Sequence, residues 1–535
     1  MNKNPDRFWI VILALGVLFD YLFWEQRVGV NYALFILACL CGGFFLLLTN
    51  KIRPARKSLW LLIPAILFSV FTFLRQEPLA KGLAFLFSSL TLFLLVVSYL
   101  GGRWPEYNLT DYILKFFKYI ISLVTDNPKF AIQVWKERDE IETSKKMRYF
   151  WAVLRGLLIA LPVVILFATL FSSADLVFEQ KLTGFLDQFE FDNVDEYISR
   201  FFFILLCAYL LAGTFLYAAS RSGDEKLRRE GRQFIKPFLG ITESTVVLGS
   251  VIVLFAIFVG IQFRYFFGGA VNIGVEGYTY SQYARRGFSE LIWVAFVSMI
   301  LILGLGFLTN RKTVVERWIF SGLSITIVSL VMVILISAYQ RIMLGIGWHG
   351  FSRLRLYPRT FLVWLGLLFI TVVVLEILRK EKFITFAALL ASFGFAFSLS
   401  LINIDAATVK HNVPRALNGM SLNIEHLSSL STDAVSPLVD EFLNPAYSEY
   451  HHQLTGAIIV CYMHYQSLED EAAKDAEVTY DWRSFNLSRW RAKRAIESIQ
   501  SELQGYGINT NRSTARIRTP SGRYYECGLS NWSFR

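Results

Sequence analysis

The stretch WIFSGLSITIVSLVMVILISA, residues 318–338, contains no Asp, Glu, Lys, Arg or His. A helix of about 20 residues is about 30 Å long, which matches the hydrocarbon core of a bilayer. Peptide groups in lipid must hydrogen-bond within their own segment, so this stretch predicts a membrane-spanning α-helix.

Similar apolar blocks recur along the chain and make the composition unusual. Hydrophobic residues are 54% of the 535 residues and charged residues 18%, against about 25% charged in soluble chains. This excludes a disordered chain, a disulfide-stapled mini-domain and a single soluble globule. We therefore predict an all-α polytopic integral membrane protein. Its eleven spans lie near residues 8–24, 28–48, 59–74, 83–100, 151–171, 201–219, 241–263, 288–308, 318–338, 361–378 and 383–402.

Two of the eleven blocks are weaker than the rest. The first carries Asp20 near its end, and the third, residues 59–74, is short and contains Pro64. The predicted number of spans therefore has an error of one span.

The basic residues indicate how the chain threads through the membrane. If the N-terminus is cytoplasmic, the inside connections hold 27 Lys and Arg and the outside connections hold 12. Cytoplasmic loops are enriched in these residues, so we predict a cytoplasmic N-terminus. With an odd number of spans, the segment after residue 402 lies outside, and one miscounted span would reverse this. The net charge of +11 is thus an orientation signal, and we predict no nucleic-acid partner.

The spans divide the chain into four parts. Residues 1–100 hold spans one to four, and residues 151–402 hold spans five to eleven. Between them, residues 101–150 form a cytoplasmic connector. Its apolar residues recur at helical spacing from Tyr112 to Ile121. This predicts an amphipathic helix, either lying on the inner leaflet or packed under the bundle.

The fourth part, residues 403–535, has a soluble composition and forms the C-terminal domain. We predict a mainly helical domain with a terminal hairpin around Pro520-Ser521-Gly522. Cys461 and Cys527 both lie in this domain, and they could pair if it is outside. The expected elements are helices at residues 431–444, 447–468 and 481–506, and hairpin strands at residues 514–519 and 523–529.

Motifs for common chemistry are missing from the sequence. We find no phosphate-binding P-loop, dinucleotide-binding glycine motif, zinc-protease motif, nucleophile elbow or paired CxxC. The six histidines are scattered. We therefore predict no metal and no cofactor, and we favour a non-enzymatic role while leaving enzyme activity open.

Two non-consecutive outer connections, residues 264–287 and 339–360, are rich in Arg and Tyr. A guanidinium group binds phosphate or carboxylate in a bidentate way, so these loops predict a site for an anionic ligand. Three ordinary explanations compete: aromatic residues line membrane interfaces, Arg pairs with nearby acids, and Arg near span ends reaches toward water. The candidate residues are Arg264, Tyr280, Tyr283, Arg285, Arg286, Glu290, Arg353, Arg355 and Tyr357.

Small residues recur at every fourth position of the last span, at Ala388, Ser392, Ala396 and Ser400. Such a stripe lets a second helix approach closely. We predict a helix-packing face here, whatever the protein does.

Several motifs also carry a family resemblance that covers roughly residues 150–495. It resembles bacterial polytopic membrane proteins with domain of unknown function 4173, a class close to 4153. The resemblance implies an integral protein of a bacterial envelope; the family has no established reaction, so no catalytic role follows. One departure is Ile404, where the family leads us to expect Pro. The matching segments are residues 155–162, 173–175, 261–269, 278–291, 352–357, 403–406, 427–434 and 482–487.

Three functions compete at this stage. The first is a binding, sensing or scaffold protein of the bacterial inner membrane. Its outer site would hold an anionic lipid, a cell-wall precursor or an envelope protein. The second is a transporter or lipid translocase. The third is a membrane-embedded transferase on a lipid-linked substrate, with Asp175, Glu276 or Glu290 as acid or base. The lipid bilayer is a partner in each case, and the oligomeric state stays open.

Overall fold

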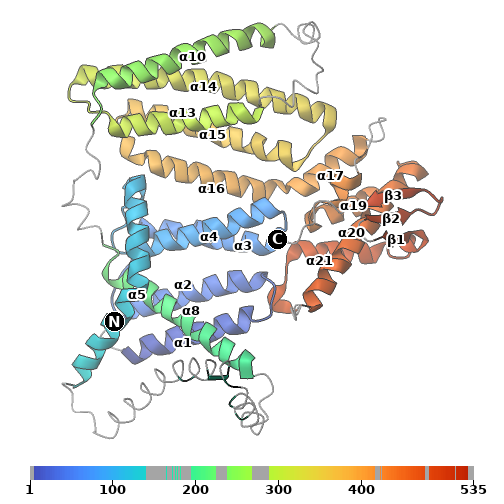
Figure 1. Cartoon of the computed structure of the whole chain (residues 1–535), viewed down its shortest axis with the longest axis horizontal. Coiled ribbons are helices and arrows are strands. Elements are labelled where there is room, and N and C mark those ends of the chain that lie inside the picture. The colour runs from blue at the N-terminus through green and yellow to red at the C-terminus, as the bar shows by residue number, and fades with distance from the viewer. Residues whose placement is uncertain are drawn as a thin grey trace. The chain divides into compact units, whose positions relative to one another are not determined.

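The computed structural model of this chain describes residues 5–139, 194–223, 238–267, 288–415, 424–475, 481–511 and 514–527. It also describes a few single residues between 164 and 181, and Leu422. The described chain is mostly helical and ends in a small antiparallel sheet (Figure 1).

The helices of the membrane part are long. They are α1 (Pro5–Phe23), α2 (Val30–Thr49), α3 (Leu62–Leu74), α4 (Pro78–Ser98), α5 (Leu109–Asp139), α8 (Val194–Ser220), α10 (Ile241–Phe267), α13 (Phe288–Leu308), α14 (Val314–His349), α15 (Arg353–Ile377) and α16 (Ile384–Ile402). The C-terminal domain holds α17 (Ile404–Arg415), α18 (Ile424–Ser428), α19 (Val435–Phe442), α20 (Glu449–Asp475), α21 (Leu487–Ser498), β1 (Gly507–Asn511), β2 (Thr514–Arg518) and β3 (Tyr524–Cys527).

Eight helices in the described part of the chain are long and apolar enough to cross a membrane. They are α2, α4, α8, α10, α13, α14, α15 and α16, and each coincides with a predicted span. The helices α1 and α3 coincide with the two weaker blocks. The block at residues 151–171 lies almost wholly outside the described residues. A multi-span helical protein is therefore confirmed, whereas the total of eleven spans stays a prediction.

The structure explains how the two weaker blocks form helices. In α1, Asp20 is buried, and its Oδ2 accepts hydrogen bonds from Nη2 and Nε of Arg200 in α8, at 2.8 and 3.1 Å. Pairing of this kind makes a buried charge tolerable. Pro64 lies in the first turn of α3, where proline removes no helical hydrogen bond.

The chain folds into two compact units, which are described separately. The first holds Met1–Trp24, Leu37–Arg53 and Lys115–Ser222, and the second holds the remaining segments. The core of the first unit is formed by α1, α2, α5 and α8. It includes Phe8, Ile12, Leu15, Phe130 and Phe215.

Helix α5 lies in the segment predicted as a connector, and several of its polar side chains face protein. Asn127 Nδ2 donates to the Tyr209 carbonyl of α8 at 2.7 Å, and Arg221 pairs with the buried Asp126 at 2.7 Å. From residue 113 to residue 124 its apolar side chains are exposed, which is the arrangement of a helix that contacts lipid, whereas Phe130 and Val134 pack in the core of the first unit. The exposed residues are Ile113, Phe116, Phe117, Ile120, Ile121 and Val124.

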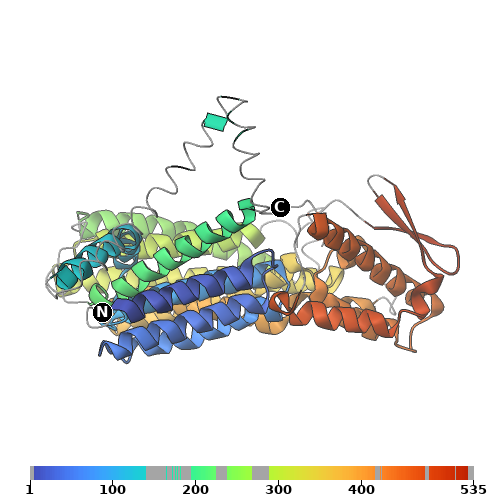
Figure 2. The same ribbon diagram turned by 90° about the horizontal axis from the view of Figure 1, so that it is seen from below.

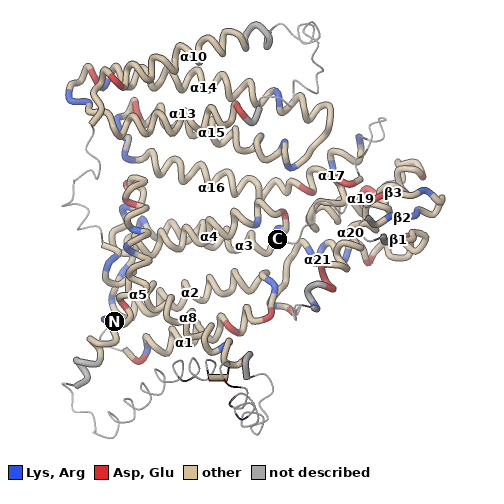
Figure 3. The backbone as a smooth tube through the Cα atoms, in the orientation of Figure 1, with Lys and Arg blue, Asp and Glu red and all other residues tan. Residues whose placement is uncertain are grey.

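The spans of the second unit run side by side, and charged residues gather at their ends (Figure 3). The helices α10, α13, α14 and α15 share an apolar core that includes Ile327, Val331, Ile334 and Phe369. The elements from α17 to β3 form the C-terminal domain, which lies at one end of these spans (Figures 1 and 2). The end of α16 is set by Asn403, which adopts a left-handed φ of 50°, a conformation that Asn tolerates.

The C-terminal domain follows the prediction in most elements. Ser431 opens the first helical turn by accepting a hydrogen bond from the Asp433 backbone. The helix α20 contains the predicted residues 447–468. The strands β2 and β3 form the predicted hairpin, with Arg518 opposite Tyr524.

The single helix predicted at residues 481–506 is wrong. A short 3-10 turn, Trp482–Ser484, precedes α21, and a second turn, Glu502–Gly505, follows it. The side chain of Asn486 caps the N-terminus of α21, so a new helix begins there. After α21 the chain turns, and Ile499 and Leu503 are buried in the domain core. The chain then enters β1, an unpredicted strand that pairs with β2.

A disulfide links Cys461 of α20 to Cys527 of β3. The Cα atoms are 6.0 Å apart, which is ordinary disulfide spacing. Both residues are fully buried in the domain core. The pairing that the sequence left open is therefore present.

Candidate functional site

The predicted loop at residues 339–360 is mostly helical. Helix α14 continues to His349, and α15 begins at Arg353. Residues 350–352 alone form the turn. With 36 residues, α14 is about 54 Å long, far more than the hydrocarbon core of about 30 Å. Its last turns therefore extend beyond the hydrocarbon, toward the C-terminal domain.

A single amide side chain fixes this turn. Asn412 of α17 accepts from the Phe351 N–H at 2.7 Å and donates to the Phe351 carbonyl at 2.8 Å. Gly350 has a φ of +76°, and a Cβ at this position would collide with the Asn412 amide. The turn therefore needs glycine, both for its backbone conformation and for space.

Two arginines hold the C-terminal carbonyls of α14. Arg415 donates from Nη1 to the Ile346 carbonyl at 2.8 Å and from Nη2 to the Gly347 carbonyl. Arg355 donates from Nη1 to the Gly350 carbonyl at 3.1 Å. Cations are favourable at a helix C-terminus, where carbonyl groups lack helical donors. These bonds hold both guanidinium groups against backbone carbonyls at the end of α14.

Arg353 has a different role, because it pairs with a fully buried carboxylate. Its Nε and Nη2 donate to Asp405 Oδ1 and Oδ2 at 2.8 and 2.5 Å. The Ser431 backbone N–H also donates to Asp405 Oδ2, at 2.8 Å. This bidentate pair joins α15 to α17 and to the loop that opens α19.

A second set of contacts joins α4 to the same region. Glu77 caps α4 by accepting from the N–H groups of Leu79 and Ala80 at 2.9 and 2.6 Å, and it accepts from the Tyr357 hydroxyl. Asp433 accepts from the Gln76 and Glu77 N–H groups at 2.8 and 3.0 Å. The C-terminal domain is thus bound to the ends of both α4 and α15.

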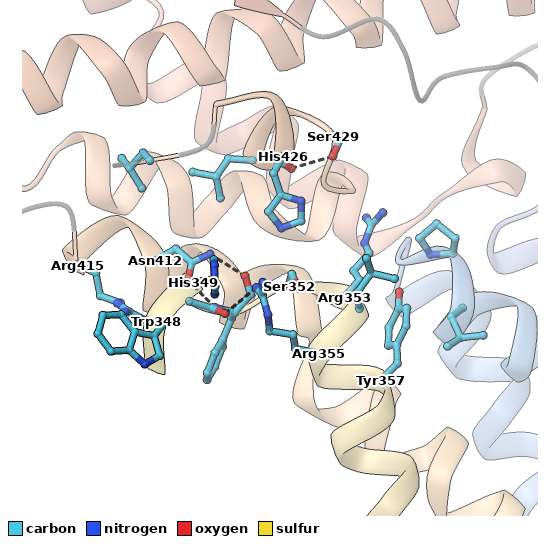
Figure 4. A pocket seen from close by; sticks show the side chains of 17 residues that line it. Trp348, His349, Ser352, Arg353, Arg355, Tyr357, Asn412, Arg415, His426 and Ser429 are labelled. Atoms are coloured by element: carbon cyan, nitrogen blue, oxygen red, sulfur yellow. Dashed lines mark hydrogen bonds between the residues drawn. The ribbon is translucent and has the colours of Figure 1, made fainter. Parts of the chain in front are cut away.

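A cavity of about 1140 Å³ lies between the α14–α15 turn, α17, α18 and the start of α4. Figure 4 shows His426 of α18 pointing across it toward the segment that carries Ser352. Among the described residues that line the cavity, three are Arg, two are His and none is Asp or Glu. We call it the basic pocket. Its lining residues are Pro78, Leu79, Trp348, His349, Gly350, Phe351, Ser352, Arg353, Leu354, Arg355, Tyr357, Asn412, Arg415, Leu422, His426, Leu427 and Ser429.

The positive charge of the pocket acts on His426. Burial lowers the pKa of this imidazole, and the charges of Arg353 and Arg355 lower it further, against the opposing effect of Asp405. A cation near His426 disfavours a second positive charge, whereas a bound anion would favour it. The arrangement suits a ligand with negative charge.

Metal ligands do not gather in the parts of the chain that the structure describes. No group of three or more His, Cys, Asp or Glu there could hold a metal ion.

Comparison with known proteins places this arrangement in a family. A family model described as a domain of unknown function (DUF4153) matches residues 62–441, well over half of the chain. The chain belongs to the DUF4153 family. No curated protein and no solved structure matches it. Every residue that lines the basic pocket falls within the DUF4153 match, whereas Cys461 and Cys527 lie beyond it.

The structure of this DUF4153 protein brings three of the predicted site residues together. Arg353, Arg355 and Tyr357 all line the basic pocket, although Tyr357 directs its hydroxyl to Glu77. Glu290 lies exposed near the start of α13. The side chain of Arg264 and all of Tyr280, Tyr283, Arg285 and Arg286 lie outside the described residues. Convergence of the two predicted loops therefore stays a prediction.

The four residues of the predicted packing stripe of α16 differ in how deeply they are buried. Ala396 and Ser400 are buried, and Ala396 packs among Phe68, Phe71 and Phe87 of α3 and α4. Ala388 is partly buried and Ser392 is exposed. The end of the stripe nearest the C-terminal domain thus contacts other helices of the DUF4153 match.

Sequence reasoning missed several pocket residues. Asn412, Arg415 and His426 were not selected, because each is ordinary for a soluble helix and none is near Arg355 in the sequence. Asp405 lies in residues 403–406, one of the segments that carry the family resemblance, and this resemblance is the sequence signal that points to its region.

Proposed function

We propose that this DUF4153 protein is a non-enzymatic multi-pass membrane protein that binds an anionic ligand in the basic pocket. The observation that carries the proposal is the lining, which holds three Arg and two His and, among its described residues, no acid. Guanidinium groups recognise phosphate and carboxylate with well-directed N–H donors. Arg355 and Arg415 are held by backbone carbonyls, so the pocket is organised before a ligand arrives.

The proposal includes a location. We place the chain in the cytoplasmic membrane of a bacterium, with a cytoplasmic N-terminus and with the pocket and C-terminal domain outside. The excess of Lys and Arg in the inside connections supports this threading. The Cys461–Cys527 disulfide supports it independently, because disulfides persist in oxidising compartments. We also propose that the chain is related to proteins with domain of unknown function 4173.

Loss of single pocket arginines should weaken anion binding. We expect Arg355→Gln and Arg415→Gln each to raise the Kd for phosphatidylglycerol about tenfold, as expected for loss of a hydrogen bond to a charged group. Binding can be measured by titrating the lipid into purified protein in a neutral detergent. Arg516→Gln is a matched control, because Arg516 pairs with Glu526 on the sheet of the C-terminal domain and does not line the pocket. Equal affinities for all four proteins would contradict the proposal.

Binding should also strengthen as the pH falls. Burial and the nearby arginines lower the pKa of His426 from its ordinary value, so protonation of the imidazole at low pH adds a positive charge to the pocket. The groups that act on it are Arg353, Arg355 and Asp405, and His349 lines the same pocket. We expect the affinity for a phosphodiester headgroup to rise up to about tenfold from pH 8 to pH 5, or one pKa unit of coupling. The phosphodiester keeps one negative charge throughout this range, so the change reports on the protein.

His426→Gln provides the comparison for this pH dependence. The variant should bind as the unchanged protein does at pH 8 and should gain less affinity at pH 5. An identical pH profile in both proteins would remove His426 from the binding site.

A further inference from the structure

The basic pocket is also apolar on part of its wall. Trp348, Phe351, Leu354 and Leu427 line it together with the arginines. Leu354 is 79% exposed and Trp348 is 64% exposed, although each also lines the pocket. A pocket for a small hydrophilic anion gains nothing from such a wall, whereas an amphiphilic ligand can use both surfaces.

An apolar stripe on α14 leads from the pocket to the end of the predicted span at residue 338. Ile336, Met343, Leu344 and Trp348 are all exposed; Ile336 and Met343 are two turns apart, and Leu344 and Trp348 are one turn apart. Residues separated by three or four positions lie on one face of a helix. From Ile336 to Trp348 this stripe is about 18 Å long, slightly more than half the thickness of the hydrocarbon core. The surface between the end of the predicted span at residue 338 and the pocket wall is therefore mainly apolar, with exposed Gln340 as one polar side chain on it.

The size of the pocket fits a ligand larger than a simple ion. Its volume of about 1140 Å³ is at the upper end of the range of roughly 300–1,000 Å³ for organic ligands. A lone phosphate would leave most of the apolar wall without contact. The basic wall and the stripe together match one molecule with a phosphate at one end and a hydrocarbon chain at the other.

We propose that the ligand is a phosphate-containing anionic lipid, which enters from the bilayer along α14 rather than from water. Its headgroup occupies the basic pocket near Arg355 and Arg415, and an acyl chain lies on the stripe formed by Ile336, Met343, Leu344 and Trp348. This inference rests on the proposed function, because it identifies the ligand of the same pocket. It adds a second recognition element that the arginines do not provide.

The test compares a lipid with its own headgroup. Full-length protein in phosphatidylcholine nanodiscs is titrated with phosphatidylglycerol, with water-soluble glycerophosphoglycerol and with inorganic phosphate. We expect the lipid to bind at least a hundredfold more tightly than either soluble anion. Leu344→Gln, outside the pocket lining, should weaken lipid binding about tenfold and leave soluble-anion binding unchanged. Trp348→Gln should weaken lipid binding about tenfold, and Arg355→Gln should weaken the binding of lipid and soluble anions alike.

Trp318→Gln is the matched control on the same helix. Trp318 is 66% exposed, nearly the same as Trp348, but it lies at the opposite end of α14. This variant should bind like the unchanged protein. If glycerophosphoglycerol or phosphate binds as tightly as the lipid, or if Trp318→Gln and Trp348→Gln weaken lipid binding equally, the lipid inference is wrong and the anion pocket stands. If none of the three probes binds, the proposed function fails as well.

Discussion

Replacing Asp405 by Asn should lower the free energy of unfolding by about 3–5 kcal/mol, the usual cost of breaking a buried ion pair. Asp405 is fully buried and accepts from Arg353 at 2.8 and 2.5 Å and from the Ser431 N–H at 2.8 Å. The asparagine would place an N–H donor against donors and leave the guanidinium of Arg353 without its charge partner. Because this pair joins α15 to the C-terminal domain, we expect the domain to detach before the spans unfold.

Two measurements separate these effects. Equilibrium unfolding of the purified protein in mixed micelles gives the loss of stability, and limited proteolysis near residue 415 reports detachment of the domain. Glu526→Gln is the matched control, since the Arg516–Glu526 pair is equally short at 2.6 Å but 60% exposed. Exposed pairs contribute less than about 1 kcal/mol. Equal stability of Asp405→Asn and the unchanged protein would show that the pair does not hold the domain.

A double replacement tests whether the charge itself matters. Arg353→Met combined with Asp405→Leu removes both charges and keeps an apolar contact of similar volume. Such replacements are often neutral or stabilising. We therefore expect the double variant to be more stable than Asp405→Asn alone, although the Ser431 N–H loses its acceptor.

The spans of this protein were predictable because hydropathy is a local property. Residues 318–338 need no distant partner to indicate a membrane helix, and α14 includes them. Asp20 shows the limit of this reasoning. Within its own segment it only weakens the apolar block, and its partner Arg200 is 180 positions away in α8. No pattern within a single span could reveal that pair.

The segment at residues 339–360 shows why the pocket was only partly predictable. The sequence predicts an outer connection at these residues, yet α14 continues because Ile342 and Ile346, one turn apart, are both buried in its core. Residue type alone does select Arg353 and Arg355, since arginine is unusual in a connection predicted to lie outside. Arg415 and His426 reach the pocket through the packing of α17 and α18, which depends on contacts that no local spacing records.

Replacing Cys461 and Cys527 with Ser should destabilise the C-terminal domain by about 4 kcal/mol, the chain-entropy value for a closed loop of this length. The two cysteines are 66 positions apart and join α20 to β3 in the core. The loss should appear as a lower midpoint for unfolding of the domain, while the spans keep their helical signal. Serine is close in size to cysteine, so loss of the cross-link dominates the change. An unchanged midpoint would mean that the two thiols are not joined in the folded protein.

The same cysteines decide the threading of the chain. In a background with Cys39, Cys41 and Cys207 replaced by Ala, the only remaining thiols are Cys461 and Cys527. If the domain is outside, denatured protein from intact cells should react with a maleimide only after reduction, because the outer compartment keeps the disulfide oxidised. Labelling without reduction, with free thiols trapped at the moment of lysis, would place the domain in the reducing cytoplasm. The basic pocket would then face the cytoplasm too, because Asp405, Asn412 and Arg415 of α17 connect it directly to this domain, and its lipid would have to come from the inner leaflet.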